Sequence, residues 1–340
     1  MSSGHAQVAY DLLQWSGARS GTLEVDTTTD LATFLRGRGI DSLLHLASGE
    51  PSPRQDAYDV VWNHQVTSTR HLLEELVRGG VRAVTFKGGE LVARHYGDHS
   101  LGLIADLDVL VPRNQIEITK QVLYQLGFRH ATFDPVDRCM RDRDCRDVAD
   151  IELHHYELAP FTKVVRPDDL ASVADAAAMI DRHPLHVDDQ GPLIVLQVDV
   201  HHNVAADAET EGFFERAVPS THGVAETFSH ADNVWFNLTR HYNEVALHDQ
   251  RSLRPFAYTL PEITCGAVDW DVVEKVAAEL CLGPTLWYFL AFCSELAPGA
   301  VPPTTLDAID ATTTSRVRDW GWQLGKLFDF RETFPREGFS

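Results

Sequence analysis

Two aspartates interrupt an apolar, strand-like stretch between Ala105 and Val111. Residues at positions i and i+2 of a strand point to the same face, so Asp106 and Asp108 should project side by side. Two neighbouring carboxylates repel each other, and burying them without a counter-charge is costly. Because a divalent cation removes that cost, the pair predicts a metal site on a largely buried strand.

A glycine pair precedes this strand, in the run Phe86-Lys87-Gly88-Gly89. Gly88 and Gly89 follow a short apolar segment and open a helix-like stretch. Glycines let a backbone approach a phosphate closely, and a helix N-terminus offers free N–H groups to an anion. Lys87 adds a positive charge. An Asp-x-Asp pair or a Gly-Gly alone is more often only a turn, but the two motifs in this order predict a metal–phosphate site.

A third carboxylate on a neighbouring strand would complete a two-metal platform. Asp199 is the favoured candidate, since it is a lone acid between two valines in a predicted strand over 193–202. Glu152, in a predicted strand over 150–158, is the competitor, and the choice stays open. His201 shares the face of Asp199 and is expected to contact the substrate or nucleotide.

Composition restricts the partners and the compartment. The formal net charge of −21 argues against nucleic acid, which needs a basic surface. The five cysteines are scattered and odd in number, which favours reduced thiols in the cytoplasm. No basic-then-apolar leader opens the sequence, and no apolar run is long enough for a membrane span.

The order of the expected elements predicts an α+β chain in three parts. We expect an N-terminal helical segment over 1–57, a catalytic domain over 58–215 and a helical C-terminal domain over 216–340. Residues 50–56 are expected to be a turn-rich connector, and the highly charged stretch 134–148 an exposed loop. The expected C-terminal helices are 230–248, 251–264, 269–281, 284–296 and 314–326.

These motifs together resemble the DNA-polymerase-β-like nucleotidyltransferase fold, whose signature is a Gly-Gly or Gly-Ser followed by an Asp-x-Asp/Glu strand. More narrowly, the chain is similar to a bacterial family of uncharacterised nucleotidyltransferases, often found in natural-product, capsule and ribosomal-peptide gene clusters. The matching segments are Phe86–Leu91, Asp106–Val111, Val198–His201, Leu238–His241 and Val301–Pro303. The resemblance spans about residues 60–310. It implies a mixed sheet with flanking helices and a helical C-terminal domain.

The resemblance also implies a reaction, the transfer of a nucleotidyl group from an NTP, ATP among them, to an acceptor. Asp106, Asp108 and Asp199 would be catalytic and bind Mg²⁺ or Mn²⁺. Lys87, Gly88, Gly89 and His201 would hold the NTP. The acidic charge favours a small-molecule or peptide acceptor in a biosynthetic pathway. Two alternatives remain, a toxin- or immunity-like or silent NTP-binding protein acting on a macromolecule, and a metal-dependent hydrolase. The oligomeric state is not predicted.

Overall fold

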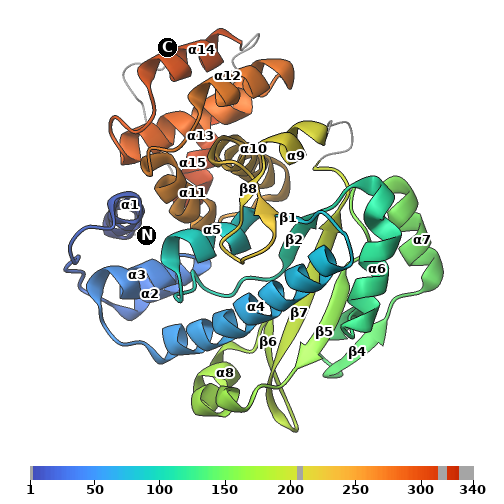
Figure 1. Ribbon diagram of the computed structural model, residues 1–340. Helices are drawn as coiled ribbons and strands as arrows, with labels where there is room; N and C mark the ends of the chain where they lie inside the picture. The colour runs from blue at the N-terminus through green and yellow to red at the C-terminus, as the bar shows by residue number, and fades with distance from the viewer. Residues whose placement is uncertain (1–2, 205–209, 313–319, 329–340) are drawn as a thin grey trace. The chain divides into compact units, whose positions relative to one another are not determined.

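The computed structural model describes residues 3–204, 210–312 and 320–328, and these fall into two compact units (Figure 1). Residues 51–229 form the first, which we call the sheet unit. Residues 1–50 and 230–340 form the second, the helical unit. The first 50 residues therefore share a unit with the C-terminal helices, whereas the sequence analysis treats residues 1–57 as a separate segment.

The sheet unit is built on a mixed sheet with the strand order β4-β3-β5-β7-β2-β1-β9-β8, and β6 pairs with β7. Its strands in the described residues are β1 Val84–Phe86, β2 Leu107–Leu110, β3 Arg129–Asp134, β4 Cys139–Asp142, β5 Phe161–Val165, β6 Leu185–Asp188, β7 Gly191–His201, β8 Val218–Pro219 and β9 Glu226–Thr227. Strand β2 runs antiparallel to β1 and parallel to β7. The fold is thus α+β, as the sequence predicts.

The sheet unit also contains helices, and the described parts of the helical unit contain helices without a strand. Those of the sheet unit are α4 Pro53–Arg78, α5 Lys87–Tyr96, α6 Ile116–Gln125, α7 Cys145–His154, α8 Ala174–Ile180 and α9 Glu211–Arg216, with 3₁₀ turns at Arg113–Gln115 and Asp168–Val173. The helical unit contains α1 Ser3–Ala18, α2 Thr29–Gly37, α3 Asp41–Ser48, α10 His230–His248, α11 Arg254–Thr264, α12 Trp270–Glu279, α13 Gly283–Leu296, α14 Pro303–Ala311 and α15 Trp320–Phe328. No helix in these parts of the chain is both long and apolar enough to cross a bilayer. The expected helix 314–326 begins in residues outside the described ranges.

The long helix α4 covers one face of the sheet, together with α6 and α8 (Figure 1). Its apolar side chains pack in one cluster with Leu107, Val109, Val198 and Val200 of β2 and β7. Burying each such side chain stabilises the fold by about 1.5–3 kcal/mol. Because side chains alternate along a strand, this packing directs the residues between them, Asp108 among them, to the other face.

Helix α4 starts inside the stretch that the sequence analysis expects to be a connector. Ser52 caps it, since its side chain accepts a hydrogen bond from the Gln55 N–H, and Pro53 occupies the first turn. A serine cap followed by proline is a helix-start signal, so residues 50–56 contain a helix boundary as well as a turn.

Two further expectations are wrong. Residues 150–158 are not a strand, because α7 covers their first half, capped by the Asp144 side chain, which accepts from the Arg146 N–H. Acids alternating with apolar residues also suit a surface helix, and no α7 residue is fully buried. The charged stretch 134–148 is not simply a loop, since β3 and β4 pair there in an antiparallel hairpin.

Candidate functional site

Three aspartates meet where β2 lies beside β7. Asp106 directly precedes β2, Asp108 lies within it, and Asp199 lies on β7. The parallel register pairs Asp108 with Asp199, so strand geometry places the three carboxylates on one face. The structure thus brings together the two residues of the Asp-x-Asp motif and the favoured third acid.

Glu152, the competing candidate, lies elsewhere. It is on α7, where its Oε2 accepts a hydrogen bond from Lys120 Nζ at 2.7 Å and its Oε1 is 3.7 Å from His130 Nε2. His154, at the end of the same helix, faces the Asp150 carbonyl oxygen at 3.0 Å. Glu152 thus ties α7 to Lys120 on α6 and to His130 on β3, whereas His154 contacts only its own helix in these bonds.

Asp106 and Asp199 share a proton. Burial, the charges of Asp108 and Asp199 and a hydrogen bond with Asp199 together raise the pKa of Asp106 to about 8, against an opposing effect of Lys87. Burial and Asp108 also raise the pKa of Asp199, although Gln197 Nε2 donates to its Oδ1 at 3.0 Å. Two carboxylates so close cannot both ionise cheaply. The pair therefore carries an excess of negative charge that a bound cation would stabilise.

Asp108 is the charged member of the group. Its Oδ1 accepts hydrogen bonds from Lys87 Nζ and from His201 Nε2, the latter at 3.0 Å. Burial alone would raise the pKa of Asp108, but Lys87 and His201 outweigh it and hold that pKa below its usual range. The His201 ring is buried and packs edge-on against Phe86, with ring centroids 5.0 Å apart. His201 therefore orients Asp108 in this structure.

The glycine pair forms the first turn of α5. This helix starts at Lys87, which takes the left-handed conformation with φ +65°, unusual for a residue with a side chain. The turn leaves backbone N–H groups of the first helical residues without partners in the helix, as every helix N-terminus does. A Cβ added to Gly89 would meet no atom within 4 Å, so the space beside this turn is open. An anion can approach there.

Glu90, in the same turn, is a residue whose importance the sequence analysis missed. Its buried carboxylate accepts hydrogen bonds from Thr85 Oγ1 at 2.9 Å, Ser220 Oγ at 2.7 Å and the Thr221 N–H at 3.0 Å. These contacts join α5 to the segment between β8 and β9. In the sequence, an acid in the first turn of a helix is explained by its favourable interaction with the helix dipole. Only the structure shows that Glu90 also binds residues from a distant part of the chain.

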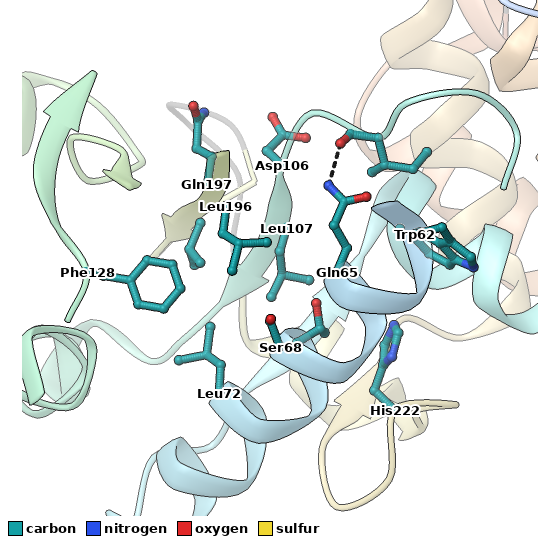
Figure 2. Close-up of a pocket in the computed structure, with 14 residues that line it drawn as sticks. Trp62, Gln65, Ser68, Leu72, Asp106, Leu107, Phe128, Leu196, Gln197 and His222 are labelled. Carbon is teal, nitrogen blue, oxygen red and sulfur yellow. Dashed lines mark hydrogen bonds between the residues drawn. The ribbon is translucent and has the colours of Figure 1, made fainter. Parts of the chain in front are cut away.

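A small pocket, partly open to solvent and with a cavity volume of about 30 Å³, lies next to Asp106 (Figure 2). Asp106 and Gln197 are at one side, and α4 supplies the opposite wall with Gln65 and Ser68. Gln65 Nε2 donates to the Ile104 carbonyl oxygen at 2.7 Å, which keeps that side chain in place. The remaining lining residues are mainly apolar or aromatic: Trp62, Leu72, Ile104, Leu107, Phe128, Leu196 and Val198. The chemistry of this lining suits an organic ligand, whereas the cavity as it stands has room for about two water molecules.

The donor set fits magnesium by its chemistry. In the ranges that the structure describes, no three His, Cys, Asp or Glu side chains are placed to hold a metal ion together. Asp108 is already paired with Lys87, whereas Asp106 and Asp199 face each other across a shared proton. Mg²⁺ commonly uses one or two carboxylates and takes its other oxygen ligands from water and substrate phosphates. Asp106 and Asp199 meet that need, and Asp108 would join if Lys87 turned to a phosphate.

A mixed sheet that presents a carboxylate group beside a glycine-opened helix is the frame of a nucleotidyltransferase. The chain belongs to the family described as uncharacterised nucleotidyltransferases, whose pattern matches residues 61–298. That range includes every element of the site. No curated protein and no solved structure matches the chain. Family membership supports nucleotidyl transfer in general and leaves the metal, the acceptor and the residue roles to be argued from the site.

Proposed function

We propose that this protein transfers a nucleoside monophosphate group from an NTP to a small-molecule or peptide acceptor, with Mg²⁺ or Mn²⁺ bound at Asp106, Asp108 and Asp199. The observation that carries the proposal is the Asp108–Asp199 register beside the first turn of α5. This register supports the proposal because carboxylate oxygens, the ligands that Mg²⁺ prefers, lie on an element next to a helix N-terminus, which can bind an anion.

Each residue of the site has its own role in the proposed mechanism. Lys87 and the N–H groups of Gly88 and Gly89 bind the triphosphate. His201 keeps Asp108 oriented, and Asp199, in its deprotonated form, accepts the proton of the attacking group, for which its raised pKa makes it a stronger base than an ordinary aspartate. The bound metal supplies Lewis-acid stabilisation of the transferred phosphoryl group and of the pyrophosphate that leaves. Most of the rate enhancement then comes from positioning and charge.

The charge of the chain supports the choice of acceptor. A net charge of −21 repels a polyanion, so a nucleic acid is a poor acceptor and a small molecule or peptide a better one. The pocket that includes Asp106 and Gln197 has mainly apolar walls and is where we place the acceptor or the base of the nucleotide.

A direct test uses the purified protein with each NTP, ATP first, and Mg²⁺ or Mn²⁺. We expect a thermal shift with at least one NTP and metal, and pyrophosphate release on adding a suitable acceptor from a panel of alcohols, amines and peptides. The absence of NTP binding would refute the proposal. Hydrolysis of substrates without NTP, supported by a transition metal, would favour the hydrolase alternative instead. Labelling of a protein rather than a small acceptor would favour the toxin-like alternative.

A further inference from the structure

A second cluster of titratable groups lies in the helical unit, where α10 begins and α11 ends. His230 Nδ1 is 2.9 Å from Glu262 Oε1 and 3.6 Å from Cys265 Sγ. The Glu262 side chain is completely buried, whereas Cys265 is exposed. None of these residues belongs to the nucleotidyl-transfer site. The cluster therefore combines a buried acid, an imidazole and a thiol that solvent can reach.

The buried acid keeps the imidazole charged. A carboxylate without a counter-charge is costly to bury, and Glu262 Oε1 also accepts a hydrogen bond from Asn233 Nδ2 at 3.3 Å. Hydrogen bonds with Cys265 and Glu262 outweigh burial and raise the pKa of His230 to about 9. At neutral pH the ring is therefore an imidazolium, and its Nδ1–H lies within reach of both the carboxylate and the sulfur.

The charged ring and a backbone group stabilise the thiolate form of Cys265. Burial acts to raise the pKa of this thiol, but hydrogen bonds from His230 and the Ala267 N–H outweigh it and lower the pKa. The chain reverses at Gly266, with φ +76°, which leads the Ala267 N–H back toward the sulfur. The C-terminal end of α11 opposes a thiolate, while the N-terminal end of α10 favours it. His230 and Glu262 are the titratable groups that face the sulfur, and the charge of Glu262 acts to raise the thiol pKa. The neutral thiol donates a hydrogen bond to the Glu262 carbonyl oxygen at 3.0 Å, which His230 and the Ala267 N–H must outweigh.

We propose that Cys265 is a nucleophilic thiol and a site of reversible modification by low-molecular-weight disulfides. In the reaction, the Cys265 thiolate attacks one sulfur of the small disulfide, and a new S–S bond forms to that sulfur. The original S–S bond breaks, and the other sulfur leaves as a thiolate that takes up the proton released by Cys265. The exchange involves no net oxidant beyond the disulfide itself, and a free thiol reverses it.

The other cysteines of the chain serve as internal controls for a test of Cys265. Cys139, Cys145 and Cys281 are also exposed, while Cys293 is buried. The full-length protein is treated with iodoacetamide, and in parallel with glutathione disulfide, over a pH series, and mass spectrometry follows each cysteine peptide. We expect Cys265 to react about threefold to tenfold faster at pH 7 than the other three exposed cysteines. We also expect its rate to be half-maximal below the ordinary thiol midpoint of about 8.5.

Two variants test the cause. His230→Gln removes the positive charge, and we expect the half-maximal pH of Cys265 to rise by about one unit. Glu262→Gln should move it by less, because the imidazole loses the acid that helps keep it protonated while the thiol also loses a carboxylate charge that raises its pKa. Cys265→Ser assigns the peptide and should leave the rates at Cys139 and Cys145 unchanged.

The outcome decides the proposal even if a variant does not fold, because the unmodified protein carries the main comparison. A Cys265 that reacts no faster than the other exposed cysteines, with a midpoint at or above 8.5, overturns it. A fast Cys265 whose pH profile is the same in folded His230→Gln protein also overturns it, because the imidazolium would then play no part.

Discussion

Glu262 in the helical unit and Asp108, at the centre of the aspartate group in the sheet unit, are both buried acids, with different counter-charges. Glu262 has a protonated imidazole at hydrogen-bond distance. The aspartate group has Lys87 and His201 on Asp108, while Asp106 and Asp199 share a proton. The first site is matched within the protein. The second is short of positive charge, which is the state expected where a metal and a triphosphate are to bind.

The largest effect is expected from Asp106→Asn. Removing this carboxylate should lower pyrophosphate release by about 10³-fold or more, because a metal ligand is lost. It should leave the unfolding temperature of the metal-free protein nearly unchanged at neutral pH, because Asp106, with a pKa of about 8, is then largely protonated and asparagine can donate a similar hydrogen bond to Asp199. An enzymatic assay and thermal denaturation measure the two effects. Glu152→Gln is the matched control, since that acid is paired with Lys120, and it should retain activity. Unchanged activity in Asp106→Asn would show that the acid group is structural.

Lys87→Met should come next. The variant leaves buried Asp108 without its ammonium partner, so we expect a loss of about 3 kcal/mol in unfolding free energy. NTP affinity should fall about tenfold to a hundredfold. Urea denaturation and calorimetry measure these effects. Lys87→Gly is the companion variant, because glycine accepts φ +65° and should recover about 1 kcal/mol of stability. Equal stability of the two variants would mean that the left-handed conformation carries no strain.

The stability that the His230–Glu262 pair gives to the fold should depend on pH. The folded pKa of His230, about 9, lies above its unfolded value of about 6.5, so the folded protein holds the proton more tightly. The resulting stability is fully present below pH 6.5 and is lost as the pH rises through 9. We expect about 2 kcal/mol, reduced by the partial exposure of the ring. The unfolding free energy is measured at pH 6 and at pH 9.5 in the native protein and in His230→Gln, and the difference between the two proteins isolates the His230 contribution. An equal change with pH in both proteins would contradict the raised pKa of His230.

The smallest effect is expected from Gln197→Leu. This variant removes the donor to Asp199 Oδ1 without changing the charge of the group. We expect a loss of about threefold to tenfold in transfer rate, the size associated with one neutral hydrogen bond. Steady-state kinetics measures it. A loss as large as that of Asp106→Asn would place Gln197 on the substrate itself.

The sequence was sufficient for the parts of the fold and site that depend on local pattern. The Asp-x-Asp spacing predicted two carboxylates on one strand face, and the lone acid between valines correctly singled out Asp199 as the residue beside them. The catalytic and metal-binding roles of these residues remain predictions. The pattern was informative because alternation along a strand needs no knowledge of distant partners.

Features that depend on distant partners could not be predicted in this way. The contacts of Glu90 come from Ser220 and Thr221, about 130 residues later in the chain. The left-handed conformation of Lys87 could not be predicted either, because lysine rarely adopts it and nothing in the sequence marks the exception. The second half of α7, residues 150–154, was predicted as part of a strand because acids alternating with apolar residues fit either structure.

The register between β2 and β7 has a consequence for how the molecule is made. Asp108 and Asp199 are roughly ninety residues apart in the chain, and β7 pairs with β2 only after β3, β4, β5 and β6 have been synthesised. A nascent chain that has left the ribosome as far as β5 contains the Asp-x-Asp pair without the third acid. The three carboxylates therefore meet only when β7 joins β2, the same step that adds Ile194, Leu196, Val198 and Val200 to the apolar cluster under α4 and so offsets their repulsion.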